Sequence, residues 1–264
     1  MKTHTKRLKS FVQNCYLSLI LLFLYIPMFT LIVLSFNTSK SRTQWGGFTL
    51  RWYTEIFSSR SITDALYNTL VIAFLSALLA TIIGTAACLG IEKMRKIPRS
   101  IIMGISNIPM LNADIVTGIS LMLVFIAFKI SLGFNTILIS HITFNIPFVI
   151  LSVMPKLKQT SKTTYEAAID LGASPVYAFF KVVFPDIIPG VFSGFLLAFT
   201  MSLDDFIITH FTRGAGINTL STLIYSEVRR GIKPSMYALS TIIFVTVMAV
   251  LIVTNFLPKR RETK

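Results

Sequence analysis

Long apolar runs alternate with polar segments along the whole chain. Most of the runs reach the ~20 apolar residues that a helix needs to cross the hydrocarbon core of a bilayer. They cover residues 15–36, 66–91, 101–128, 135–154, 187–210 and 236–257. The pattern predicts an all-α membrane protein with six transmembrane helices in a single domain over residues 1–264.

Proline modifies this picture in the third run, which is interrupted within the stretch NIPMLNAD. Because proline lacks a backbone N–H, we expect a kink or a break near Pro109 and Asn112. The fifth run, 187–210, is expected to form a continuous helix. A cleaved signal peptide is the alternative for the first run, but its apolar region would be only about 7–15 residues long and would end at a small-residue cleavage site. We therefore interpret the first run as an uncleaved helix.

Composition agrees with a membrane location. Hydrophobic residues make up 53% of the chain, Phe occurs 22 times and the mean hydropathy is +0.71. A net charge of +14 would suggest nucleic acid if the basic residues formed one patch, but they are spread between the apolar runs. The two cysteines lie in apolar runs and give neither a disulfide framework nor a metal-ligand spacing.

The distribution of Lys and Arg predicts the orientation. With the N-terminus inside, the cytoplasmic segments hold 16 Lys and Arg and the outer segments hold 9, over similar total lengths. The cytoplasmic segments are then 1–14, 92–99, 156–186 and 258–264, and the outer ones are 37–65, 129–134 and 211–235. Basic residues favour the cytoplasmic side, so we expect both termini to be cytoplasmic.

The cytoplasmic segment 156–186 is longer than a simple helix connection requires. We expect a short helix that ends at Gly172 in a left-handed C-cap. Ser174 and Pro175 then provide the N-cap and the first position of a second short helix, which runs through Val183. Pro185 and Pro189 are expected to stop that helix and to start the fifth span.

Within this segment, EAAIDLGASPVYAFFKVVFP resembles the EAA motif of ABC-importer permeases. The resemblance implies a MetI-like permease fold, in which this cytoplasmic loop docks on a dimer of ATPase subunits and transmits their motion through residues 160–185. The matching positions are Glu166, Ala167, Ala168, Gly172, Val182, Phe184 and Pro185. The chain has no G-x-x-x-x-G-K-[ST] loop, so we expect a non-catalytic subunit, with ATP and Mg bound by the partner ATPase.

A wider resemblance, to the spermidine/putrescine permeases of ABC importers, extends along the whole chain. It rests on GGFTLRWYTEIF, NTLVIAFLSALLATIIGTAACLGI, the D-I-V-x-G-I-S-L stretch, SLDDFIITHF and IYSEVRRGIKPSMYALST. It implies a bacterial inner-membrane protein that forms the translocation path with a second, homologous permease. It also implies an extracytoplasmic polyamine-binding protein as the donor of cargo.

Three acidic residues lie inside the predicted spans: Asp114, Asp204 and Asp205. No Lys or Arg accompanies them there, and unpaired intramembrane carboxylates suit a cationic cargo that acts as their counter-ion. On a straight helix Ser202, Asp205 and Thr209 form one polar stripe, so these residues are predicted to line the substrate path, with Asp205 favoured over Asp204.

Structural roles are the alternatives for these groups. The paired acids would then bond backbone or partner-subunit groups, and Asp114 would cap the second half of the third span. His141 is interpreted as a packed or hydrogen-bonded residue. The spacing of His210 from the two acids does not favour a metal site.

Three other functions are alternatives for such a chain. An intramembrane aspartyl protease needs its two acids on separate helices, and a cation-coupled carrier needs no ATPase-docking loop. A permease for another small solute, such as an amino acid, a phosphonate or a metal ion, remains the nearest alternative.

Overall fold

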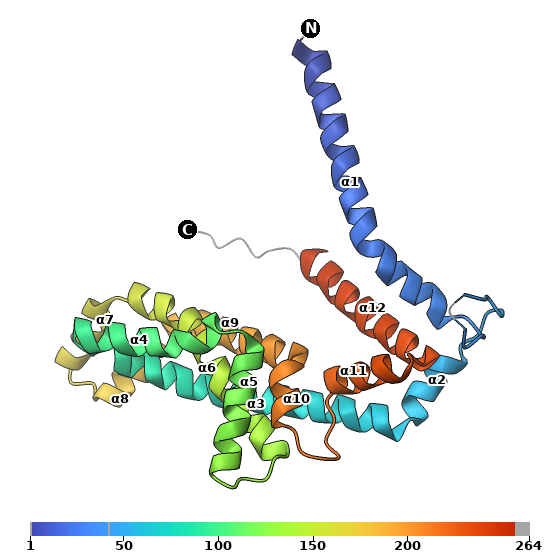
Figure 1. Cartoon of the computed structure of the whole chain (residues 1–264). Helices are drawn as coiled ribbons and strands as arrows, with labels where there is room; N and C mark the ends of the chain where they lie inside the picture. Colours follow the sequence, from blue (N-terminus) through green and yellow to red (C-terminus); the bar gives the residue numbers. More distant parts are fainter. Residues whose placement is uncertain (1, 42, 257–264) are drawn as a thin grey trace. The chain divides into compact units, whose positions relative to one another are not determined.

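Helices form nearly all of the regular structure. The computed structural model describes residues 2–41 and 43–256, and helices follow one another along the chain (Figure 1). The one β-type pairing among these residues is a bridge between Asn37 and Phe48. The all-α prediction is confirmed. Packing divides the chain into two units, residues 1–63 with 226–264 and residues 64–225, and each is described separately.

The first unit pairs the two terminal helices. Helix α1 (Lys2–Ser35) packs along α12 (Pro234–Phe256), and α2 (Arg51–Ser58) also contacts α12. Asn37 organises the segment that follows α1. Its buried side chain donates to Gln44 O (2.8 Å) and accepts from Gly46 N (2.8 Å), and Trp52 Nε1 donates to the Asn37 carbonyl (2.7 Å).

The second unit contains most of the remaining helices. They are α3 (Arg60–Glu92, whose first turn belongs to the other unit), α4 (Lys96–Leu111), α5 (Asp114–Ala127), α6 (Phe134–Gln159), α7 (Lys162–Asp170), α8 (Pro175–Ala178), α9 (Phe184–Asp204), α10 (Ile207–Thr212) and the first half of α11 (Leu220–Arg230). A π-helical turn, Phe179–Val183, joins α8 to α9.

Four helical stretches are long and apolar enough to cross a membrane: Gln13–Ser35, Arg60–Glu92, Phe134–Gln159 and Pro175–Asp204. Helices α4 and α5 add a fifth if they are counted as one span bent by 106°. The expected break in the third run is confirmed, since Asn112 is extended (φ −77°, ψ 152°) while Pro109 stays inside α4. The apolar stretch of α12 among the described residues, Pro234–Ala249, is shorter than these spans, so the count of six spans stays a prediction. Residue 257 and the basic segment 258–264 lie outside the described residues.

Small residues let α9 lie close to α6. A Cβ on Gly190 would lie 3.1 Å from the Ser152 carbonyl oxygen, and one on Gly194 would lie 3.3 Å from Val149 Cα. Ala198, one turn further, is fully buried. Such a ridge of small residues brings helix backbones together where lipid offers no hydrophobic drive for association. The core beside it contains Ala77, Ala80, Cys88, Ile91, Ile150, Val153 and Met154.

Two glycines offer a matched test of this packing. A Cβ on Gly84 would lie 2.8 Å from Val149 Cγ1, whereas one on Gly104 meets no atom within 4 Å. Both are within helices, so alanine gains roughly 1 kcal/mol of helix propensity at each. We expect Gly104→Ala to raise the unfolding temperature, and Gly84→Ala to lower it through overpacking of about 1–3 kcal/mol.

The measurement is thermal unfolding in detergent. Cys88 is fully buried, so its reaction with a thiol dye reports how much of the protein has unfolded. A Cys15→Ser background removes the exposed thiol. Equal shifts for the two variants would contradict close packing at Gly84.

Candidate functional site

The fifth predicted span is broken in the middle of its acidic pair. Helix α9 ends at Asp204, Asp205 is extended (φ −62°, ψ 126°), and α10 begins at Ile207. The Asp205 carboxylate accepts the backbone N–H groups of Ile208 (3.2 Å) and Thr209 (2.7 Å), as an N-cap side chain does. The expected continuous helix is therefore wrong, because this side chain replaces the backbone acceptors of a continuing helix.

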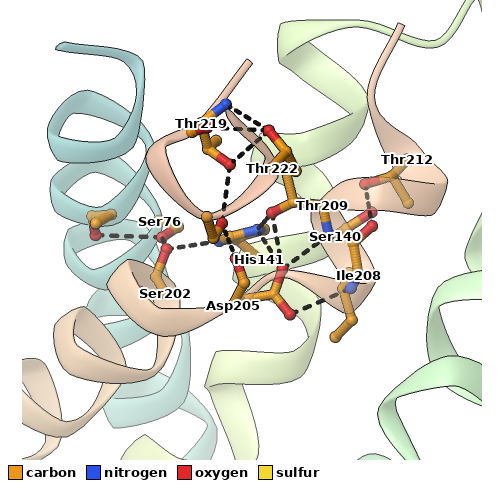
Figure 2. Close-up of polar contacts among 12 residues, drawn as sticks. Ser76, Ser140, His141, Ser202, Asp205, Ile208, Thr209, Thr212, Thr219 and Thr222 are labelled. Carbon is orange, nitrogen blue, oxygen red and sulfur yellow. Dashed lines mark hydrogen bonds and ion pairs between the residues drawn. The ribbon is translucent and has the colours of Figure 1, made fainter. Parts of the chain in front are cut away.

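A buried imidazole connects the two sides of the break (Figure 2). His141 of α6 is 1% exposed; its Nδ1 lies 2.5 Å from Ser202 Oγ on α9, and its Nε2 lies 2.9 Å from Thr209 Oγ1 on α10. Ser76 Oγ of α3 lies 3.0 Å from Ser202 Oγ, and Thr209 Oγ1 lies 2.7 Å from Asp205 Oδ2. Side chains from four helices and the break thus form one hydrogen-bonded chain.

The donors and acceptors in this chain can be assigned. With Asp205 ionised, the Thr209 hydroxyl donates to its carboxylate, so the Thr209 oxygen accepts from His141 Nε2–H. In the neutral imidazole Nδ1 is then an acceptor. Ser202 donates to it and accepts in turn from Ser76. One tautomer therefore satisfies all of these side-chain contacts.

Further hydrogen bonds fasten the ends of the break to the unit. The carbonyl of Asp205 accepts from Ser221 Oγ at the start of α11 (2.7 Å). The carbonyl of Thr212, at the end of α10, accepts from Thr136 Oγ1 of α6 (2.8 Å). An unpaired backbone group that is buried away from water costs several kcal/mol, so these side chains make the interruption tolerable.

The two adjacent acids occupy opposite environments. The Asp205 side chain is 8% exposed and bonded as described, with His141 Nε2 3.4 Å from its Oδ2. Asp204 is exposed, and its carboxylate makes no hydrogen bond or ion pair with any residue that the structure describes. The structural alternative therefore fits Asp205 in this structure, and its preference over Asp204 as the path-facing acid stays a prediction.

The other residues predicted to line the path also divide into two groups. Ser202 and Thr209 are 3% and 0% exposed, so they lie behind the surface as parts of the network. Asp114 is exposed and is the first residue of α5, where a negative charge is favourable beside the helix N-terminus.

Sequence reasoning missed the role of His141 as the centre of this network. Its hydrogen-bonded state was expected, but its partners lie 61 and 68 residues away on helices whose packing no local spacing reveals. Ser76 was missed for the same reason, because its partner Ser202 is 126 residues away.

The predicted caps of segment 156–186 are confirmed. Gly172 has φ +87°, its N–H donates to Ile169 O (2.9 Å), and the following N–H donates to Ala168 O (3.0 Å), which closes α7 in a left-handed cap. Ser174 accepts from Tyr177 N (3.3 Å) as the N-cap of α8, and Pro175 begins that helix.

The motif residues lie on both parts of this segment. Glu166, Ala167, Gly172 and Pro185 are exposed, and Ala168, Val182 and Phe184 are half-buried. Beside them is a groove of about 720 Å³, lined in part by Tyr165, Glu166, Val176 and Phe180. Leu171 and Val176 expose apolar side chains on this loop and are 90% and 67% exposed.

The second short helix does not stop at the prolines, contrary to expectation. Pro175–Asp204 forms one helical stretch of 30 residues, with the π-helical turn Phe179–Val183 just before Pro185. Such a turn changes which carbonyls are paired, so the chain accommodates prolines that lack an N–H without ending the helix.

These features define a multi-helical membrane transport subunit: apolar helices of spanning length, a helix break at Asp205 stabilised by side chains of the protein, and a capped helical loop with exposed apolar residues. Residues 78–262 match the family described as the binding-protein-dependent transport system inner membrane component, and the chain belongs to that family. It is thus a multi-pass inner-membrane permease subunit.

The chain is similar over nearly its full length to curated permeases. It is 34% identical to the spermidine/putrescine transport system permease protein PotC of Haemophilus influenzae, over 96% of this chain and 98% of that protein. It is 37% identical to PotC of Escherichia coli K12, over 96% of each chain. It is also 37% identical to the putrescine transport system permease protein PotI of the same strain, over 91% of this chain and 88% of that one.

Solved structures confirm the fold class at low sequence identity. A bacterial ABC transporter that imports the acidic polysaccharide alginate aligns with TM-score 0.72 and 17% identity, over 100% of both chains. The MetNI methionine ABC transporter aligns with TM-score 0.58 and 18% identity, over 75% of this chain and 95% of that one. The ABC-importer permease fold is therefore shown.

Two threonines of α10 offer a test of the network. Thr209→Val removes the acceptor for His141 Nε2 and one donor to Asp205, whereas Thr212→Val removes a hydroxyl that bonds only the Ile208 carbonyl of its own helix. Both side chains are fully buried. We expect Thr209→Val to lower stability by about 1–3 kcal/mol, because it leaves buried polar groups unpaired, and Thr212→Val to cost clearly less.

The midpoint of thermal unfolding in detergent measures this difference. Equal losses in the two variants would show that the contact between His141 and Thr209 adds nothing to stability.

Proposed function

We propose that this chain is the permease subunit of an ATP-driven, binding-protein-dependent importer of polyamines, spermidine or putrescine. The observation that carries the proposal is the identity of 34% and 37%, over 96% of the chain, to two permeases named for spermidine and putrescine transport.

The chemistry of Asp204 supports a cationic cargo. Its carboxylate is exposed at the C-terminal end of α9, where the helix dipole also favours positive charge. All 25 Lys and Arg lie in the predicted connections, so no basic side chain inside the predicted spans competes with cargo for this carboxylate. A polyamine ammonium group would serve as its counter-ion. Asp114 is the second exposed acid of the proposed path.

The loop that carries Glu166 and Gly172 supports transport powered by a separate ATPase dimer, which would hold the ATP and Mg. The exposed positions of this loop would contact the ATPase. The helical stretch Pro175–Asp204 then connects the loop to Asp204 over about 45 Å. A displacement of the loop would therefore reach the proposed path through one continuous helix.

A second permease and an extracytoplasmic binding protein complete the proposed assembly, with both termini of this chain in the cytoplasm. Transport would proceed by alternating access, in which ATP binding closes the ATPases and the binding protein releases cargo into the path.

A charge-conserving pair of substitutions tests the cation path. In vesicles that carry the full assembly, we expect Asp204→Asn to lower uptake of labelled spermidine or putrescine about tenfold or more, because the counter-charge is lost. Asp204→Glu keeps that charge and is expected to retain much of the uptake. Unlabelled putrescine should compete, and amino acids should not.

Wild-type uptake of amino acids rather than polyamines would overturn the proposed substrate. Equal uptake by Asp204→Asn and wild type would exclude Asp204 from the path and leave the substrate class standing.

Two glycines with the same strain test the coupling loop. Gly172 and Gly216 have φ +87° and +88°, and neither has an atom within 4 Å of a Cβ built on it. Arginine at either position therefore meets similar backbone strain, but only Gly172 lies in the proposed docking loop. We expect Gly172→Arg to abolish co-purification of the ATPase and uptake, and Gly216→Arg to retain ATPase binding.

Normal ATPase binding and transport in Gly172→Arg would show that the docking assignment is wrong. Loss of binding in both variants would attribute the effect to backbone strain instead.

A further inference from the structure

We propose that His141 is a positioning residue for the substrate path: its imidazole holds the break between α9 and α10 and thereby fixes where Asp204 stands. This inference rests on the proposed role of Asp204 as the acid that meets cargo. Nothing in it requires His141 to touch cargo, and its 1% exposure excludes such contact in this structure.

The imidazole bonds both flanks of the break. Ser202 precedes Asp204 by two positions, and Thr209 follows the break on α10. The two ring nitrogens point in different directions, so a single planar group from α6 sets the separation of two helix ends. Figure 2 shows the ring between Ser202 and the Asp205–Thr209 pair.

The break needs such support because its sequence is compatible with a helix. Phe206, Ile207 and Ile208 carry no turn signal, and on a continuing helix Thr209 N–H would bond the Asp205 carbonyl. In the structure that N–H bonds the Asp205 carboxylate, and Ser221 takes the carbonyl. His141 stabilises this arrangement because Nε2 donates to the Thr209 hydroxyl and lies 3.4 Å from the carboxylate.

Loss of the imidazole would therefore act on Asp204 through the break. The Thr209 hydroxyl and the Asp205 carboxylate would lose a buried donor, and the helical alternative would gain population. Asp204 would then no longer end a helix, and the attraction of the free helix end for a cation would be lost with it.

Two amide substitutions separate the two contacts of the ring. Gln places its terminal amide as many bonds from Cα as Nε2, so His141→Gln retains a donor for Thr209. Asn reaches only as far as Nδ1, so His141→Asn retains a contact with Ser202 and loses the one with Thr209. Ser140→Ala is the matched control, because Ser140 is a fully buried neighbour whose hydroxyl bonds only Thr136 O of its own helix.

The experiment combines hydrogen exchange and uptake in the full assembly. We expect His141→Asn to speed backbone hydrogen exchange over residues 205–212. We also expect it to raise about tenfold the KM of putrescine uptake, measured against the concentration of putrescine-loaded binding protein. We expect His141→Gln to stay within a few-fold of wild type in both measurements and Ser140→Ala to match wild type. Unfolding temperatures distinguish a local effect from general loss of the fold.

Three outcomes overturn the proposal. In the first, exchange over residues 205–212 is unchanged in His141→Asn. In the second, exchange rises while KM and maximal rate stay at wild-type values, so the break does not position the path. In the third, Ser140→Ala reduces uptake as much as His141→Asn does, which shows that the effect is not specific to the imidazole. Absence of polyamine uptake in the wild type would instead refute the proposed function and, with it, the path that His141 is proposed to position.

Discussion

Hydrocarbon provides no hydrogen-bond partner for the backbone, and the second unit is organised around this constraint. Each interruption of an apolar helix must be satisfied by the protein itself. At the break after Asp204 the partners are the carboxylate of Asp205, the hydroxyl of Ser221 and, one step further, the imidazole of His141. Around Pro185 a π-helical turn serves the same purpose without ending the helix. An intramembrane acid is thus first a structural necessity of the break.

This constraint explains why two carboxylates stand side by side in an apolar sequence. Because Asp205 is extended and turned into the protein, its neighbour Asp204 is left at the end of α9 with an exposed carboxylate. A single acid in this place could either bond the backbone of α10 or expose its charge, but not both. The pair provides one group to cap α10 and one charge that remains available at the surface.

The sequence predicted those features that depend on local chemistry. The left-handed cap at Gly172, the N-cap at Ser174 and the break beside Asn112 each follow from the backbone preferences of one or two residues, and all were confirmed. The break at Asp205 and the central place of His141 in the hydrogen-bonded network were missed, because both depend on contacts between helices far apart in the chain. The stripe drawn through Ser202, Asp205 and Thr209 assumed a straight helix. In the structure these three residues lie around the imidazole of His141.

The same distinction explains the continuity of the segment that carries the EAA residues. Proline was expected to end the helix after Val183, since it removes a backbone N–H. The π-helical turn changes which carbonyls are paired just before Pro185, so the helix continues without that N–H. The helix consequently extends from Pro175 to the acid pair. Its two ends are held by different kinds of contact. The Ser174 side chain caps the first turn, and buried side chains of neighbouring helices bond Ser202 and Asp205 at the other end. In the proposed coupling, a displacement of the loop would travel along this helix to the break beside His141. The hydrogen bonds there run through the hydroxyl groups of Ser202 and Thr209, which can rotate to new partners.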